Sequence, residues 1–215
     1  MSWAELSSLT ISLLALAISS AAFWLTLLRR GDVRMTSPTV VYFGPDAGAG
    51  GLPKLFLRTL LYSTSPRGRV VEQIWVRLRR GETQQNFSIW VYGDEKLSRG
   101  SGLFVGPEGV AANRHFLLPK DTPDLNFYAG DYVLEVHAEI AGDKKSRLLH
   151  GVHLSLPERL TAALKEPDTG VYFDWGPDSR AYHAHAERKP IPTPDQLKSL
   201  FDTVLRSGTG KTNEV

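Results

Sequence analysis

A long uncharged segment near the N-terminus constrains the fold more than any other feature of the sequence. No Asp, Glu, Lys or Arg occurs from Leu6 to Leu28. About 20 apolar residues in a helix cross the hydrocarbon core of a bilayer, and a helix satisfies its own backbone hydrogen bonds there. The sequence therefore predicts a transmembrane helix at residues 6–28, with the lipid bilayer as its partner, after an N-terminal tail of residues 1–5.

Three other interpretations fit this segment less well. A cleaved signal peptide has a basic start and a shorter apolar run, whereas the only charged residue before this run is Glu5. A buried helix of a soluble domain is shorter and carries a polar stripe. A surface amphipathic helix carries charges on one face, and this segment has none. We therefore expect a retained membrane span.

The residues that flank the span predict its orientation. Arg29, Arg30 and Arg34 follow it, with only Asp32 to oppose them, and no Lys or Arg precedes it. Basic residues next to a span favour the cytoplasmic side. We therefore expect a protein of the cell membrane with its N-terminus outside and its C-terminal body in the cytoplasm. The inverted orientation is the alternative.

Composition excludes several classes of protein for the body that follows. The chain of 215 residues has no cysteine, which removes disulfide frameworks and cysteine-bound zinc. Its 25 basic and 23 acidic side chains give a net charge of +2, which excludes a globally basic nucleic-acid-binding protein. We expect no nucleic-acid partner and predict no cofactor.

Alternating hydrophobic residues in the body predict short antiparallel strands. Between Tyr132 and Ile140 every second side chain is apolar or small, and the others include two glutamates and a histidine. This pattern is typical of a half-buried strand. About seven such segments separated by turns predict a mainly β domain, an antiparallel β-sandwich at residues 54–188. Proline and glycine predict a juxtamembrane linker at residues 29–53, in which only residues 39–43 are expected to form a short strand.

Two other predicted strands make specific claims about side-chain placement. Residues 83–92 are expected to form one continuous strand. The strand predicted at residues 147–156 places Leu148 on the same inward face as Val152, Leu154 and Leu156.

The segment from Gly130 to Val136 resembles a late strand of immunoglobulin-like domains. In those domains a tyrosine after a Gly/Asp turn anchors a corner of the sandwich, and Tyr132 follows Gly130-Asp131 here. The chain lacks the cysteine pair of those domains. The resemblance implies an immunoglobulin-like general architecture and no particular function.

The C-terminal region predicts a stiff linker followed by an amphipathic helix. Pro190 and Pro192, directly after Lys189, favour an extended backbone. Apolar residues then recur at helical spacing from Leu197 to Leu205. We predict the linker and helix at residues 189–206 and a disordered tail at residues 207–215.

A histidine-rich hairpin is the candidate metal site. If residues 176–179 form its loop, Tyr172 lies opposite His183 and shares a face with Asp174 and His185. Two histidines and one carboxylate can bind a divalent metal. Asp174, His183 and His185 are therefore the candidate ligands. The competing interpretation is structural, because aromatic and histidine side chains are common on half-buried strands.

A basic and aromatic strand face is the candidate contact for lipid or a partner. Trp75, Arg77 and Arg79 point the same way in the strand predicted at residues 70–80. Such a face fits anionic lipid headgroups or an acidic partner, and it also fits a solvated outer sheet face.

These features favour a binding role over catalysis. The Gly-x-Ser-x-Gly pattern of a nucleophile elbow does not occur in the chain. We therefore expect a single-pass membrane protein whose β-sandwich is an interaction or scaffolding module for a protein partner. The alternatives are a membrane-tethered metal-dependent hydrolase that uses the His/Asp cluster and an anionic-lipid- or envelope-associated structural protein.

Overall fold

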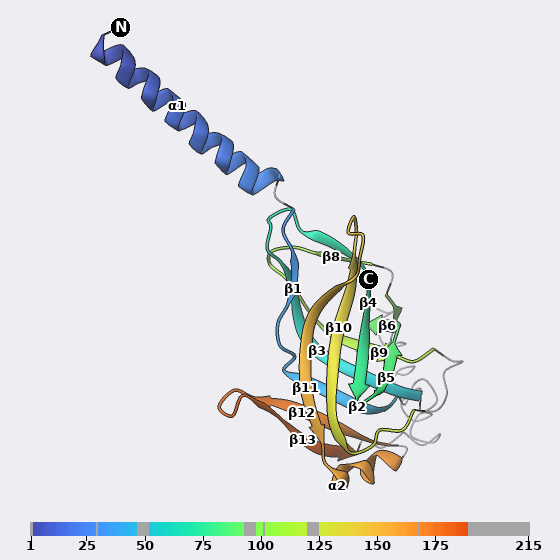
Figure 1. The fold of residues 1–215 in the computed structure, drawn as a ribbon. Coiled ribbons are helices and arrows are strands. Elements are labelled where there is room, and N and C mark those ends of the chain that lie inside the picture. The colour runs from blue at the N-terminus through green and yellow to red at the C-terminus, as the bar shows by residue number, and fades with distance from the viewer. Residues whose placement is uncertain are drawn as a thin grey trace, which may run out of the picture.

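A long helix leads into a β domain (Figure 1). The computed structural model describes residues 2–28, 30–46, 52–92, 98–100, 102–119, 125–166 and 168–188. Three sequence predictions lie outside the described residues: the linker and helix at 189–206, the tail at 207–215, and Arg29.

The N-terminal apolar segment forms a continuous helical rod. Helix α1 (Trp3–Phe23) passes into a π-helical turn, η1 (Trp24–Leu28). By length and composition, the stretch Trp3–Thr26 is apolar enough to cross a membrane. Helix α1 has no buried residue, and it extends away from the β domain (Figure 1). The prediction of an apolar N-terminal helix is confirmed.

The helix begins three residues before the predicted start, because Ser2 caps it. The Glu5 backbone N–H donates to the Ser2 hydroxyl at 3.3 Å, and the Ser2 backbone N–H donates to the Glu5 carboxylate at 2.9 Å. This reciprocal pair is a capping box. Residues 3–5 therefore belong to the helix and not to a tail.

The described part of the β domain contains two antiparallel sheets. The 8-stranded sheet has the order β13-β12-β2-β3-β9-β6-β7, with β1 paired to β3, and the 5-stranded sheet has the order β11-β10-β4-β5, with β8 paired to β4. The strands of the first sheet are β1 (Val33–Met35), β2 (Val40–Asp46), β3 (Leu52–Ser63), β6 (Ile89–Tyr92), β7 (Ser98–Arg99), β9 (Val110–Leu117), β12 (Thr169–Gly176) and β13 (Ala181–Arg188). The strands of the second are β4 (Arg69–Arg80), β5 (Thr83–Phe87), β8 (Leu103–Val105), β10 (Gly130–Ile140) and β11 (Arg147–Leu156). A short helix α2 (Glu158–Thr161) and a 3-10 turn η3 (Ala163–Lys165) separate β11 from β12.

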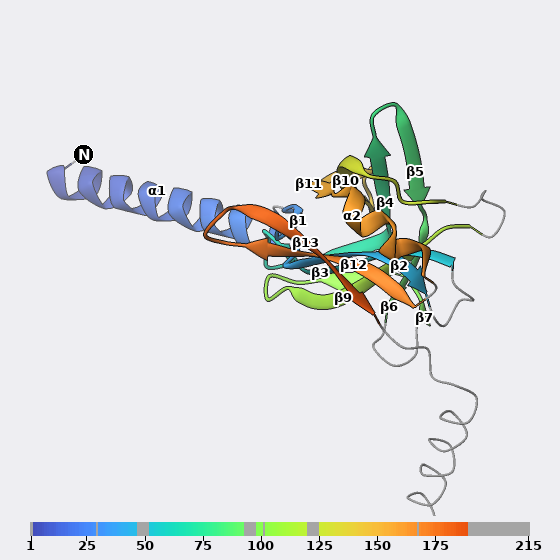
Figure 2. The ribbon, with the colours of Figure 1, turned by 90° about the horizontal axis from the view of Figure 1, so that it is seen from below.

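The two sheets form two layers over one hydrophobic core. Figure 2 shows β4, β10 and β11 on one side and β2, β3 and β9 on the other. The alternation predicted in β10 is confirmed, since its inward residues are all buried in that core: Tyr132, Leu134, Val136, Ala138 and Ile140. The mainly β, antiparallel character is confirmed, and the immunoglobulin-like architecture stays a prediction.

The segment predicted as a juxtamembrane linker contains two strands of the first sheet. Strand β2 lies between β12 and β3, and its Val41 and Phe43 have no exposed surface. The prolines that suggested a linker are tolerated, because β12 pairs with β2 only along residues 40–43. Pro45, which cannot donate a ladder hydrogen bond, lies beyond that pairing and faces Pro53 of β3.

The prediction of one strand at residues 83–92 is wrong, because the chain changes sheet within it. Strand β5 belongs to the 5-stranded sheet and β6 to the 8-stranded sheet. Phe87 and Trp90, on either side of the crossing, are both buried in the shared core. The apolar pattern is the same for one strand in a sheet and for two strands that turn a corner.

The prediction that Leu148 points inward is also wrong, because the β10–β11 ladder is irregular. Val136 pairs with His150, but the next residue, His137, pairs with Leu148, so one residue of β11 is skipped. An extra residue in one strand moves the following side chains to the other face. Leu148 is consequently 56% exposed.

Truncating Phe43 tests whether β2 is part of the folded domain. We expect Phe43→Ala to lower the free energy of unfolding by about 3–5 kcal/mol, because it leaves a cavity in the core. A substitution in a surface linker has an effect within about 0.5 kcal/mol. Urea unfolding of the full chain in detergent, followed by tryptophan fluorescence, measures the difference. Thr39→Ala, at an exposed position, is the control, and equal effects of the two variants would refute the assignment.

Candidate functional site

The histidine-rich hairpin forms, with a register two residues away from the predicted one. Asp174 pairs with His183 and Tyr172 pairs with His185, so the pairing of Tyr172 with His183 is wrong. The hairpin loop lies one residue later than predicted, because Gly176 still pairs with Ala181. A shift by two residues preserves the face of every side chain, so the four side chains still share one face.

The three candidate metal ligands do not converge. His185 Nδ1 lies 3.3 Å from Asp174 Oδ2, whereas His183 Nε2 lies 2.8 Å from the Ser179 hydroxyl. Within the described ranges, no group of three His, Asp or Glu side chains is placed to hold a metal ion. The hairpin therefore gives no geometric support to metal-dependent hydrolysis.

The basic and aromatic face of β4 is partly neutralised by its neighbour β10. Arg79 donates to Glu135 at 2.8 Å, and Arg77 lies 3.7 Å from the same carboxylate. The Trp75 indole stacks on His137, with 5.4 Å between ring centroids. The structure brings the three predicted residues together, but their strongest contacts are within the sheet.

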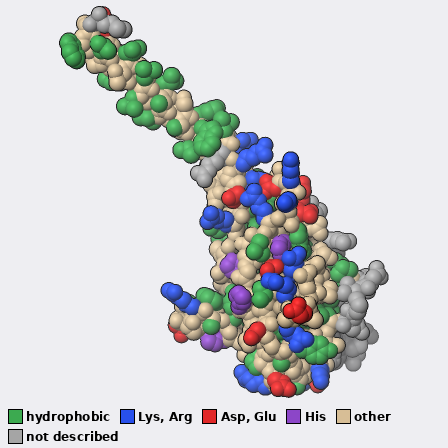
Figure 3. Space-filling view, viewed as in Figure 1, with side chains coloured by type: hydrophobic (Ala, Val, Ile, Leu, Met, Phe, Trp, Pro, Cys, Tyr) green, Lys and Arg blue, Asp and Glu red, His purple; other side chains and the backbone are tan. Residues whose placement is uncertain are grey.

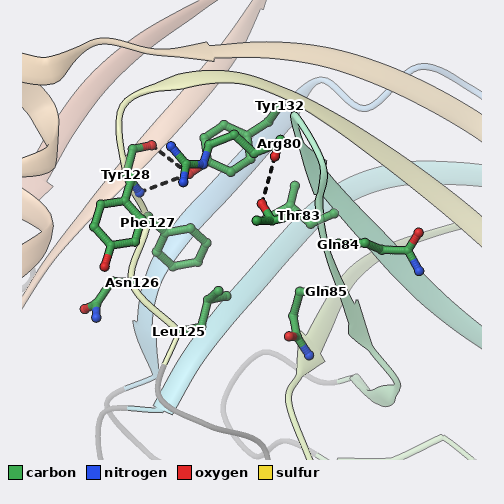
Figure 4. A pocket seen from close by; sticks show the side chains of 10 residues that line it. Arg80, Thr83, Gln84, Gln85, Leu125, Asn126, Phe127, Tyr128 and Tyr132 are labelled. Atoms are coloured by element: carbon green, nitrogen blue, oxygen red, sulfur yellow. Dashed lines mark hydrogen bonds between the residues drawn. The ribbon is translucent and has the colours of Figure 1, made fainter.

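A small cavity lies at the end of the domain where β4 turns into β5 (Figure 4). The Tyr132 hydroxyl donates to the Tyr128 carbonyl oxygen at 2.6 Å and accepts from the Tyr128 N–H at 3.0 Å. The Arg80 guanidinium lies 5.1 Å from the centroid of the Tyr128 ring. The Tyr132 hydroxyl thus anchors the chain at this corner, and the immunoglobulin-like architecture itself stays a prediction. The cavity measures about 210 Å³, below the roughly 300–1,000 Å³ of typical ligand sites.

A larger groove lies along the edge of β11. Within the described chain, β11 is the last strand of its sheet and pairs only with β10. The groove has a volume of about 700 Å³ and runs between residues 150–155 of β11 and the β12–β13 hairpin. Trp175, Arg180 and Tyr182 are the large side chains that the hairpin contributes.

Hydrogen bonds hold the hairpin wall of this groove in place. The Tyr182 hydroxyl donates to the Pro38 carbonyl oxygen at 2.7 Å, and the Trp175 backbone N–H donates to the Thr39 carbonyl oxygen at 3.0 Å. Burial raises the pKa of Tyr182 to about 12, so the hydroxyl remains a donor at neutral pH. Burial lowers the pKa of His150 and so favours the neutral ring, in which one nitrogen donates and the other accepts.

The connection between helix and domain is short, and Gly31 and Asp32 within it form hydrogen bonds to the domain. Residues 29–32 join η1 to β1. The Asp32 N–H donates to the Thr64 hydroxyl at 2.8 Å, and the Thr64 N–H donates to the Asp32 carbonyl oxygen at 2.9 Å. Gly31 has φ +66°, and a Cβ added there would lie 2.3 Å from the Ser65 Cβ. Glycine is therefore required at position 31.

A four-residue ion cluster, Asp32–Arg69–Asp143–Arg147, fixes this connection to the domain; we call it the tether cluster. Arg69 donates to the Gly31 carbonyl oxygen at 3.2 Å and to Asp143 at 2.8 Å. Arg147 binds Asp32 and Asp143, each at 2.6 Å. The hydrogen bond from Arg69 is the largest influence on Asp143 and holds the pKa of its carboxyl below the usual value. The hydrogen bond with Asp32 in turn raises the pKa of Arg147.

Sequence analysis identified neither the groove nor the tether cluster. The contacts of the cluster join residues 74 and 115 positions apart, and no local pattern encodes such pairs. Searches of protein-family models, curated proteins and solved structures found no match.

Removing the Asp143 carboxylate tests the tether cluster. We expect Asp143→Asn to lower the free energy of unfolding at pH 7 by roughly 1–3 kcal/mol, because two guanidinium groups lose a charged acceptor. A lowered carboxyl pKa stabilises the fold above the unfolded value and ceases to do so as the pH falls through the folded value. The difference from wild type should therefore shrink below about pH 4.

Urea unfolding of the full chain in detergent at neutral and acidic pH measures this effect. Asp178→Asn, at an exposed loop position, is the matched control and should change little at either pH. An Asp143 effect that persists unchanged in acid would contradict the role of its charge.

Proposed function

We propose that this protein is a single-pass membrane protein whose β domain faces the cytoplasm and binds an extended segment of a protein partner. The anchor is supported by the exposed, apolar helix Trp3–Thr26. The orientation is supported by Arg30 and Arg34, which follow the helix and are exposed. Basic residues on that side favour cytoplasmic placement.

The main support for the binding proposal is the outer edge of β11, which pairs with no strand among the described residues. An edge strand presents backbone N–H and C=O groups that can pair with another chain. Proteins that bind extended peptides use such an edge for affinity and neighbouring pockets for specificity. Residues 150–155 of β11 line a groove of about 700 Å³ next to this edge, so backbone and pocket are offered together.

The hairpin wall supplies side chains suited to protein recognition. Trp, Tyr and Arg dominate binding hot spots, and Trp175, Arg180 and Tyr182 line the groove. The rings of Trp175 and Tyr182 lie 5.0 Å apart, and the Tyr182 hydroxyl is held by the Pro38 carbonyl oxygen. An ordered side chain loses less entropy on binding.

The orientation is tested with single cysteines, which are unique in a chain that has none. In intact expressing cells, we expect a membrane-impermeant maleimide to label Ser2→Cys and to leave Glu82→Cys unlabelled until the membrane is permeabilised. Glu82 lies in an exposed turn of the β domain. Labelling of Glu82→Cys alone in intact cells would establish the inverted orientation.

The groove is tested by blocking it. A Cβ added at Gly151 meets no atom within 4 Å, so Gly151→Trp can fill the groove without disturbing the fold. Peptides are selected from a displayed library on the full chain in lipid nanodiscs. We expect Gly151→Trp to weaken their binding by roughly tenfold or more, as loss of a central contact does.

Gln84→Trp is the matched control, because it adds the same side chain at the other edge strand, β5. It should leave peptide binding unchanged. Absence of any enriched peptide, or equal loss in both variants, would reject the groove as the binding site.

A further inference from the structure

Exposed apolar side chains of the β domain gather at the end that joins the helix. Outside the N-terminal helix, the described large hydrophobic side chains that are exposed are Val70, Phe104, Tyr128 and Leu148. Three of the four lie at this end, and only Tyr128 lies at the opposite end. Exposed apolar side chains at one end of a domain are candidates for an interaction surface when they lie close together.

Contacts with the tether place Val70, Phe104 and Leu148 there. Val70 follows Arg69, which donates to the Gly31 carbonyl oxygen, and Val70 pairs with Phe104 across β4 and β8. Leu148 lines a hollow together with Asp32 and Arg34. Figure 1 shows β8 and the start of β4 next to the point where α1 ends.

The Phe104 ring is held in its exposed position. It lies against Gly68, where an added Cβ would come within 2.4 Å of the ring. Phe104 is 59% exposed and Val70 is 44% exposed. A fixed, exposed aromatic ring loses little conformational freedom when it enters an interface.

Cationic side chains surround this apolar group. Lys144 and Lys145 are exposed in the turn between β10 and β11, and the Ala141 N–H of that turn donates to the Val70 carbonyl oxygen. No ion pair is formed by either lysine within the described residues, whereas Arg69 and Arg147 bind Asp143. Figure 3 shows Lys and Arg side chains, with Asp and Glu side chains among them, where helix and domain meet.

If α1 spans a membrane, the short connection keeps this end of the domain next to the bilayer surface. Residues 29–32 alone separate η1 from β1. An extended residue covers at most about 3.6 Å, so the start of β1 lies within about 18 Å of the end of the helix. The hydrogen bonds of Gly31 and Asp32 to the domain prevent the connection from swinging freely.

We propose that Val70, Phe104, Leu148, Lys144 and Lys145 form a membrane-docking surface that lies on a bilayer containing anionic lipid. The inference rests on the membrane anchor of the proposed function and is independent of the groove. The apolar side chains enter the interfacial region, and the lysines bind anionic headgroups. The lipid headgroup is the proposed ligand, because the short connection keeps this end of the domain beside the end of the helix and its exposed lysines complement an anionic surface.

Docking is measured with a single cysteine in the reconstituted full chain. Phe104→Cys and Glu82→Cys are each labelled with an environment-sensitive fluorophore in phosphatidylcholine vesicles, with or without phosphatidylglycerol. Phe104 pairs with Val70 at the start of β4, and Glu82 lies just after the end of β4. The strand between them is about 36 Å long at 3.3 Å per residue. We expect a blue shift and quenching by headgroup spin-labelled lipid at position 104 only, stronger with phosphatidylglycerol.

Two charge variants separate a local contact from a general charge effect. Lys144→Gln/Lys145→Gln removes two cations from the surface and should shift the docking equilibrium by roughly 30-fold toward the undocked state. Arg159→Gln/Lys165→Gln removes two exposed cations from α2 and η3 and should leave quenching at position 104 unchanged. Equal effects of the two pairs would overturn the proposal.

Alkaline carbonate extraction of the same vesicles distinguishes a failure of the docking surface from a failure of the membrane anchor. Quenching at position 104 equal to that at position 82, in protein that resists extraction, overturns the docking surface and leaves the anchor standing. Release of the protein by carbonate overturns the anchor and the docking surface together.

Discussion

The placement of the β domain relative to the helix depends on the tether cluster, Asp32–Arg69–Asp143–Arg147. A four-residue connection by itself would allow a wide range of orientations. Here Arg69 and Arg147 bind both the connection and the β10–β11 turn, so the turn and the start of β4 are fixed beside the end of the helix. Isolated surface ion pairs contribute little, but these guanidinium groups each bind more than one acceptor in one network. The cluster consequently determines which end of the domain faces the anchor.

Sequence pattern predicted those parts of the fold in which one physical requirement dominates. The uncharged segment had to be a helix if it is to enter lipid, and α1 forms over it. In β4 and β10 one face packs on the core and the other does not, so a period of two is visible in the sequence. The sequence did not indicate the partner of Tyr132, although the contact with Tyr128 spans only four residues.

The remaining features depend on contacts that a local pattern does not record. The exposure of Leu148 follows from one skipped residue in the β10–β11 ladder, and the apolar residues of β11 look the same with or without it. The crossing between β5 and β6 follows from which sheet each strand joins. The prolines of residues 29–53 suggested a linker, yet β2 accommodates Pro45 where it lacks a neighbour on the β12 side. The groove requires β11 and the β12–β13 hairpin, which belong to different sheets.

Strand β11 belongs to both proposed surfaces, and this relates them in space. Arg147 and Leu148 lie at the tether, and residues 150–155 line the groove. At about 3.3 Å per residue, the groove begins about 10 Å from the tether and extends to about 25 Å. A segment that pairs with β11 would therefore run along the strand, away from the headgroups. In the proposed membrane-anchored arrangement, a partner in the same membrane would meet the groove at a raised effective concentration, so modest intrinsic affinity would be sufficient for association.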